Sequence, residues 1–159
     1  MYSCGIYEKT LQKLIRGLKY HKQKELAGYL AQFMYEYWKE LSDKRDFQVI
    51  PVPLHENRIK KRKYNHMELT ADEFCKLSAF TPNYELIKRI KDTKPQYKLT
   101  RTERLKNLAG AFEVDLTKDL KKPVLILDDI CTTGATFEEM IKTLKSKGIT
   151  EIVCLASSS

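Results

Sequence analysis

The pattern of apolar and polar positions along the chain predicts alternating helices and strands. In the first forty residues, apolar side chains repeat at helical spacing in two stretches, 11–18 and 24–41. Three short apolar runs bounded by turn residues follow at 47–54, 124–127 and 152–156, and we expect each to form a strand. Together these patterns indicate that strands and helices alternate along one chain.

The segment 123–156 has the pattern of a strand–helix–strand unit. Val124 to Leu127 are apolar at every position, which is typical of a strand buried on both faces of a parallel sheet. Apolar residues then recur at helical spacing between 137 and 144, and Gly148 is placed to end that helix. We therefore predict an α/β fold with a mainly parallel twisted sheet flanked by helices, preceded by a helical segment.

A pair of carboxylates and a short loop connect this strand to its helix. Backbone N–H groups at a helix N-terminus can hold a phosphate, and Gly134 lets the backbone approach it closely. The loop also offers three hydroxyl donors, of which the last is a candidate N-cap: Thr132, Thr133 and Thr136. Asp128 and Asp129 would repel a phosphate, so we expect them to accept hydrogen bonds from a ribose diol.

This segment resembles the phosphoribosyl-diphosphate (PRPP) motif of the type I phosphoribosyltransferases, in which an aliphatic strand, two acidic residues and a TTGAT-like loop follow one another. The alternative is an ordinary strand–turn–helix with a chance Asp-Asp pair. The resemblance implies that the ribose hydroxyls meet Asp128 and Asp129, and that the 5-phosphate meets the loop residues Thr132, Thr133, Gly134, Ala135 and Thr136. Mg²⁺ is expected to come with PRPP, with the two aspartates as candidate contacts.

Two basic segments are candidates for the rest of the site. We interpret the run from Arg58 to Asn65 as a loop that binds pyrophosphate through Arg58, Arg62 and Lys63. A solvated charge run, or a localisation or nucleic-acid patch, is the alternative. The polar segment 89–107 is predicted to be a mobile functional loop whose Arg104 acts over the site, the alternative being an ordinary surface excursion.

The whole chain resembles the ComF family, the phosphoribosyltransferase-like proteins linked to natural competence. The resemblance rests on Leu18-Lys19-Tyr20, on Val52-Pro53-Leu54-His55 followed by Arg58, Arg62, Tyr64 and Asn65, and on Thr93, Gln96, Leu99, Arg104, Asn107 and Gly110-Ala111-Phe112. Many members begin with a Cys-rich zinc module, whereas this chain has only Cys4 in that region. Lys63 and His66 replace a glycine and a glutamine of the family, and we interpret His66 as a polar helix-start residue rather than an acid–base catalyst.

Length and composition limit the domain number, the use of the cysteines and the location that the sequence predicts. A chain of 159 residues predicts one domain, with a helical part at 1–45 and a PRPP-binding core at 46–159. Four scattered cysteines without a CxxC motif predict neither a disulfide framework nor a zinc site. The sequence has no apolar stretch of membrane-spanning length and no signal peptide, so we expect a cytoplasmic protein without membrane insertion.

The resemblance implies Mg²⁺-dependent transfer of ribose 5-phosphate from PRPP to an acceptor that the sequence does not identify, with release of pyrophosphate. The net charge of +8 suits a polyanionic partner, although a lysine-rich solvated surface also explains it. The alternative function is a non-catalytic competence factor that uses the fold as a sensor or as a scaffold for uptake of single-stranded DNA. A nucleobase salvage transferase is a third reading. No residue stands out as a general base.

Overall fold

The computed structural model of the protein describes residues 1–93 and 99–159. Lys94, Gln96 and Lys98, which belong to the predicted basic loop, lie outside the described residues. The elements are β1 (Tyr2–Ser3), α1 (Lys9–Tyr20), α2 (Leu26–Glu40), β2 (Gln48–Pro51), α3 (Glu56–Arg62), α4 (His66–Ser78), β3 (Thr81–Pro82), β4 (Ile87–Arg89), α5 (Arg101–Leu108), β5 (Phe112–Val114), β6 (Val124–Ile130), α6 (Ala135–Lys145) and β7 (Ile152–Ser158). Within the described ranges, no helix combines the length and apolarity needed to cross a membrane.

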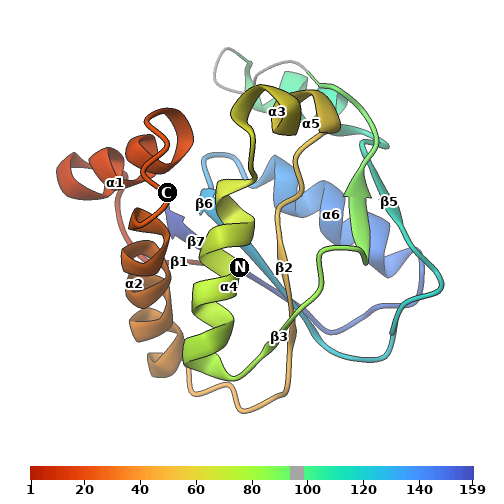
Figure 1. Ribbon diagram of the computed structural model, residues 1–159. Coiled ribbons are helices and arrows are strands. Elements are labelled where there is room, and N and C mark those ends of the chain that lie inside the picture. The colour runs from red at the N-terminus through yellow and green to blue at the C-terminus, as the bar shows by residue number, and fades with distance from the viewer. Residues whose placement is uncertain (94–98) are drawn as a thin grey trace.

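A five-stranded sheet forms the centre of the molecule (Figure 1). Its strand order is β1-β7-β6-β2-β3, and each neighbouring pair is parallel. In the middle of the sheet, Ile50 of β2 lies beside Ile126 of β6, which lies beside Cys154 of β7. Strands β4 and β5 form a separate antiparallel pair. The predicted α/β fold with a mainly parallel sheet is therefore confirmed.

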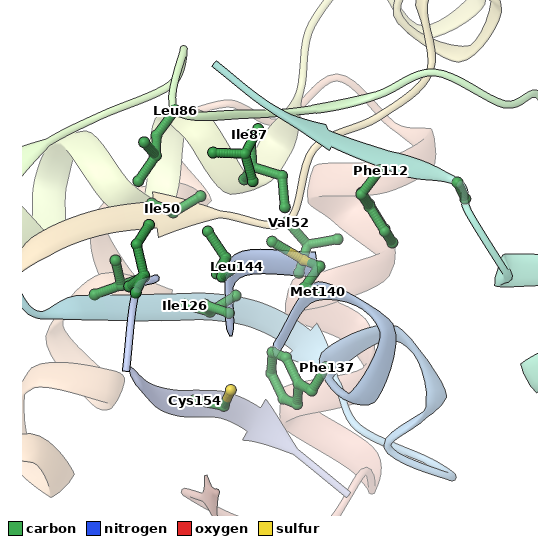
Figure 2. Packing of buried hydrophobic residues seen from close by; sticks show 14 of the residues in the cluster. Ile50, Val52, Leu86, Ile87, Phe112, Ile126, Phe137, Met140, Leu144 and Cys154 are labelled. Atoms are coloured by element: carbon green, nitrogen blue, oxygen red, sulfur yellow. The ribbon is translucent and has the colours of Figure 1, made fainter. Parts of the chain in front are cut away.

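Helices cover both faces of the sheet, as the apolar pattern of β6 requires. Val124 and Ile126 point into a cluster with α6, β4 and β5, whereas Leu125 and Leu127 point into a cluster with α1, α2 and α4. Figure 2 shows the first cluster, in which side chains of β4, β5 and α6 surround those of β2 and β6. Each fully buried aliphatic side chain stabilises this arrangement by about 1.5–3 kcal/mol, so both layers hold the end of β6 in place.

The structure corrects several predicted boundaries. The segment interpreted as a pyrophosphate loop is mostly helix α3, whose N-cap His55 accepts a hydrogen bond from the Asn57 N–H (3.3 Å). The polar segment 89–107 contains the end of β4 and all but the last residue of α5. The N-terminal part is not purely helical, because β1 pairs with β7 in the central sheet. The predicted strand 47–54 ends at Pro51, so Pro53 lies beyond it.

Candidate functional site

The loop between β6 and α6 lies at the carboxyl end of the central strands, where open α/β sheets bind ligands. The Cys131 N–H donates to the Ser158 carbonyl oxygen (2.8 Å), which ties the start of the loop to β7. Gly134 ends the loop at a φ of 75°, a left-handed conformation that glycine adopts without steric penalty. Gly134 is the N-cap of α6, so Thr136 lies in the first helical turn and the prediction that it caps the helix is wrong.

The loop leads into the N-terminus of α6, where backbone N–H groups can attract an anion. The Glu138 N–H donates to the Gly134 carbonyl (2.8 Å), which closes the first turn of α6. Thr133 turns its hydroxyl toward the Ala135 N–H (3.5 Å). The structure thus brings together at one helix N-terminus the five residues 132–136 that the sequence predicts to bind a phosphate, with the helix dipole behind them.

Arg104 reaches this loop from α5, which is a helix within the segment predicted to be a mobile loop. Its Nη1 donates to the Thr132 hydroxyl oxygen, and its Nε donates to the Leu99 carbonyl (2.9 Å). The start of α5 is fixed by a capping box, in which the Glu103 N–H donates to the Thr100 hydroxyl (3.4 Å) and the Glu103 carboxylate accepts from the Thr100 N–H (2.7 Å). The cation therefore stands beside the loop on a capped helix.

The two adjacent carboxylates lie on opposite faces of the sheet, because side chains alternate along a strand. Asp128 is half-buried on the side that α6 covers, and its Oδ1 accepts the Asp129 N–H (2.9 Å). Burial and the neighbouring Asp129 charge raise the pKa of Asp128, and Lys19 opposes this shift only in part. Of the two adjacent carboxylates, Asp128 is the one that is partly exposed.

Asp129 lies at the centre of a buried polar network on the other face. Its Oδ2 is 2.6 Å from Lys19 Nζ and 2.6 Å from His66 Nε2, and its side chain is 6% exposed. Arg62 Nη1 lies 3.4 Å from His66 Nδ1. Because a guanidinium only donates, we assign the proton of His66 to Nε2, which then donates to Asp129.

The electrostatics of this network follow from its burial. Burial opposes ionisation of Asp129, but the charge of Lys19 and the hydrogen bond from His66 lower its pKa overall. Burial would lower the pKa of Lys19, but Asp129 raises it above its ordinary value. Burial lowers the pKa of His66, so the imidazole is neutral at pH 7. The network is thus an ion pair between Lys19 and Asp129 supported by a neutral histidine.

The predicted pyrophosphate residues do not all face the same way. Arg58 is half-buried and its Nη2 donates to the Thr93 carbonyl (2.9 Å). Arg62 stacks its guanidinium 5.6 Å from the ring centroid of Tyr20. Lys63 is exposed and ends α3 at a φ of 74°. Two cations of α3 therefore face the neighbouring segments, and the third faces solvent.

Sequence reasoning missed three residues of this region. Lys19 appears in the sequence only as part of a family anchor, and His66 only as a helix-start residue. Arg89 of β4 is buried and its Nη2 donates to the Thr93 hydroxyl. Lys88 and Arg89 are adjacent cations in the sequence, and only the alternation of β4 in the folded structure separates the buried Arg89 from the exposed Lys88.

Comparison with known sequences identifies relatives along most of the chain, although no family model matches it. Competence protein F of Haemophilus influenzae is 29% identical over 158 residues, covering 96% of this chain and 69% of that protein. DNA utilization protein YhgH of Salmonella typhi is 26% identical (93% and 66% covered), and competence protein ComFC of Bacillus subtilis is 25% identical (92% and 58% covered). The chain therefore spans about two thirds of the length of such relatives or less. These matches confirm the resemblance to the ComF family.

Solved structures with a similar fold include hypoxanthine phosphoribosyltransferases. The enzyme from Staphylococcus aureus has a TM-score of 0.48 and 12% identity, covering 84% of this chain and 62% of its own. The enzyme from Trypanosoma cruzi has a TM-score of 0.44 and 13% identity, covering 91% and 64%. The mainly parallel sheet flanked by helices is the architecture that the resemblance to type I phosphoribosyltransferases implies.

Proposed function

We propose that this relative of the ComF competence proteins binds PRPP and, in a competence-linked role in the cytoplasm, transfers its ribose 5-phosphate to an acceptor. The observation that carries the proposal is the loop from Cys131 to Gly134. It joins a strand that ends in two carboxylates to the N-terminus of α6, with Arg104 bound to Thr132 beside it. This arrangement supports the proposal, because groups suited to a phosphate and groups suited to a sugar belong to one loop and the strand before it.

Each part of PRPP has a counterpart in the proposal. Residues 132–136 would receive the 5-phosphate through backbone N–H groups and hydroxyls. Asp128 would accept hydrogen bonds from the ribose hydroxyls, and Arg104 would cover the loop. Arg58 and Arg62 would meet the diphosphate, while the exposed Lys63 would contribute mainly by its charge. Asp129 would reach the sugar only by releasing Lys19 or His66, so its part is to fix the end of β6.

Mg²⁺ fits one of the two carboxylates. When it is bound with PRPP, it neutralises charge on the diphosphate. Mg²⁺ in proteins usually takes one or two carboxylates besides substrate oxygens and waters, and Asp128 would supply one. Asp129 does not fit this role while Lys19 and His66 hold its carboxylate. In the described part of the chain, no group of three or more His, Cys, Asp or Glu side chains is placed to hold a metal by itself.

The proposed reaction replaces one bond at the anomeric carbon with another. The acceptor nucleophile forms a bond to C1, the bond from C1 to the diphosphate oxygen breaks, and that electron pair leaves with pyrophosphate. Positive charge on the sugar and negative charge on the leaving group develop together, so catalysis would consist mainly of positioning and electrostatic stabilisation. The acceptor's proton would pass to solvent, since no described side chain is assigned as its base.

The alternative is a non-catalytic competence factor that keeps PRPP binding as a sensor or uses the fold as a scaffold for DNA uptake. The relatives named for competence and DNA utilization, together with the net charge of +8, favour keeping this reading. In this case the acceptor would be absent and single-stranded DNA or a competence protein would be the partner. The enzyme and sensor readings share the same ligand site, whereas the scaffold reading does not require it.

Ligand-dependent stabilisation tests the proposal. PRPP with Mg²⁺ should raise the melting temperature of the protein, because a ligand that binds only the folded state stabilises it by about 2.7 kcal/mol at a concentration of 100 Kd. Asp128→Asn should reduce the shift. Asp46→Asn removes the same charge from an exposed pair with Lys122 and should leave the shift unchanged. Wild-type protein that shows no shift at millimolar PRPP would rule out the enzyme and the sensor together.

Turnover separates the two readings once binding is established. Pyrophosphate release in a screen of nucleobase, amine and oligonucleotide acceptors would favour the transferase. Binding of PRPP without release under all these conditions would favour the sensor. For the scaffold reading, affinity for a single-stranded oligonucleotide should fall steeply with added salt, since phosphate contacts release counterions.

A further inference from the structure

Arg89 is a buried cation whose hydrogen-bonding capacity is not used within the fold. Arg89 is 8% exposed. Its guanidinium lies over the ring of Phe112, 5.7 Å from the ring centroid. Nη2 donates to the Thr93 hydroxyl, but Nε is buried and has no hydrogen-bond partner in the described part of the chain. A buried donor without an acceptor is destabilising, so its retention calls for a reason.

A second guanidinium, that of Arg58, also donates to Thr93. Arg58 donates to the carbonyl oxygen of Thr93 while Arg89 donates to its hydroxyl, so both cations gather on one neutral residue. The segment that carries Thr93 is held further by Asn57, whose side-chain N–H donates to Asp92 (2.8 Å). Burial first, and then the charge of Arg58, lowers the pKa of Arg89 to about 10, with Asp128 and Asp92 acting in the opposite direction. Thus two cations that repel each other are held by one neutral residue.

We propose that Arg58 and Arg89 form a subsite for the diphosphate group of PRPP, with Arg89 as a ligand contact contributed by β4. This inference rests on the proposed function. A guanidinium binds phosphate through a planar fork of two N–H donors, and a diphosphate has two phosphate groups to receive two forks. The oxygens of Thr93 take one donor from each arginine, and the ligand takes their place and satisfies Nε.

The location of Arg89 selects a compact anion. Arg89 lies over Phe112, which belongs with Ile126 to one buried cluster, and Asp128 follows Ile126 by two residues on the same face of β6. The subsite is therefore on the same side of the sheet as the carboxylate proposed for the ribose, which suits the order of groups in PRPP. Arg89 is buried and Arg58 is half-buried, and both donate to Thr93, so a ligand that binds both guanidiniums takes the place of these bonds. A nucleic-acid backbone, whose phosphates are carried on a bulky polymer, does not fit such a buried donor.

Comparison of PRPP with ribose 5-phosphate isolates the diphosphate. In calorimetric titrations with Mg²⁺, the wild-type chain should bind PRPP more tightly than ribose 5-phosphate. Arg89→Met should weaken PRPP binding by about 10- to 100-fold, which is the usual effect of losing hydrogen bonds to a charged group. Its affinity for ribose 5-phosphate should stay within about twofold of wild type, because that ligand lacks the group concerned.

Two further variants keep the test interpretable. Lys88→Met removes a cation from the neighbouring, exposed position of β4 and should leave both affinities unchanged. Arg89→Lys keeps the charge but removes the fork, so it should still weaken PRPP binding selectively. If Arg89→Met does not fold, Arg89→Lys alone decides the question.

Each result has a defined meaning. Wild-type chain that binds neither ligand contradicts the proposed function. Wild-type chain that binds both ligands equally contradicts only the diphosphate subsite. The inference also fails if the Arg89 variants bind PRPP normally or lose both ligands to the same extent. It fails again if they lose affinity for a single-stranded oligonucleotide while PRPP binding is unchanged.

Discussion

Two aspartates that follow each other in sequence have pKa values shifted in opposite directions, because the strand turns them to different neighbours. Asp129 faces Lys19 and His66, which favour its ionised form although it is buried. Asp128 faces away from this network and is disfavoured as an anion by burial and by Asp129. A ligand that brings a cation or hydroxyl donors to Asp128 therefore supplies what the protein already supplies to Asp129. The neighbouring carboxylates are suited to different tasks.

Replacement of Asp129 should affect stability first. Asp129→Asn leaves the ammonium of Lys19, whose side chain is 18% exposed, without its counter-ion. Removing one partner of a buried ion pair destabilises a protein by about 3–5 kcal/mol, and relief of the repulsion with Asp128 offsets part of this. Urea unfolding would measure the change, with Glu36→Gln, which breaks an exposed pair with Lys39, as the control. Equal stabilities of the two variants would contradict the network.

The histidine in this network predicts a specific pH dependence. The pKa of His66 in the folded protein lies below its ordinary value of 6.5 because the ring is buried. Below pH 6.5 the unfolded chain therefore binds a proton that the folded chain does not, and stability is lost as the pH falls. The loss approaches about 1.4 kcal/mol per pH unit.

His66→Gln should flatten that dependence. A glutamine amide can donate to Asp129 without titrating, so the free energies of unfolding of wild type and variant should diverge below pH 6.5. His21→Gln replaces an exposed histidine and should leave the wild-type curve unchanged. Curves that stay parallel from pH 7 to pH 5 for His66→Gln would show that the imidazole does not carry the effect.

At the level of elements, sequence patterns predicted those with an apolar face and missed those without one. β6 was predicted because Val124 to Leu127 are apolar at every position, and α6 because its buried positions recur with period 3.6. α3 has no buried residue, so its seven residues show only charge. Its acidic first turn and basic last turn suit the helix dipole and were the remaining signal. β1 and β3 have two residues each, too few for any pattern.

Residues of the candidate site were predictable to the extent that one segment carries them. The loop 132–136 and its carboxylates form a local motif, and Arg104 was expected from the family resemblance. The partners of Asp129 come from α1 and α4, and their proximity depends on how two helices pack against the sheet. Arg89 likewise meets Arg58 only through the turn at Thr93. Such contacts require the fold.

The capped start of α5 predicts a coupling between helix stability and ligand binding. Thr100→Ala removes the side chain that accepts from the Glu103 N–H, which costs about 1 kcal/mol at a helix N-terminus. Arg104 lies in the next turn and contacts Thr132, so PRPP affinity should fall together with helicity. Thr100→Ser keeps the cap and serves as the control. Thermal shift with PRPP would show the coupling, and an undiminished shift in the alanine variant would disprove it.

Across the whole molecule, family anchors that lie far apart in sequence meet at one end of the sheet. The Tyr64 hydroxyl donates to the Leu18 carbonyl (2.5 Å), Lys19 pairs with Asp129, and Tyr20 stacks on Arg62. In Figure 1, α3 and α5 lie at the same end, where β2 and β6 finish. The end of α1, helices α3 and α5 and the loop between β6 and α6 therefore lie at one end of the sheet, and a ligand there would contact several elements at once.

Hydrogen exchange should show whether a ligand protects this end of the sheet and not the other. PRPP with Mg²⁺ at about 100 Kd should slow exchange by up to about 100-fold in residues 132–137 and in α3, because their opening would require ligand release. At the opposite end of the sheet, the Gln48 side-chain amide donates to the carbonyl oxygens of Asp119 and Lys122 (3.0 Å each) and so fixes the turn 119–122. Amides of that turn that exchange by local fluctuation should be unaffected, since they open with the ligand still bound. Ribose 5-phosphate should protect residues 132–137 but not α3, which separates the phosphate contact from the diphosphate contact. Equal protection at both ends of the sheet would contradict a site confined to the carboxyl end.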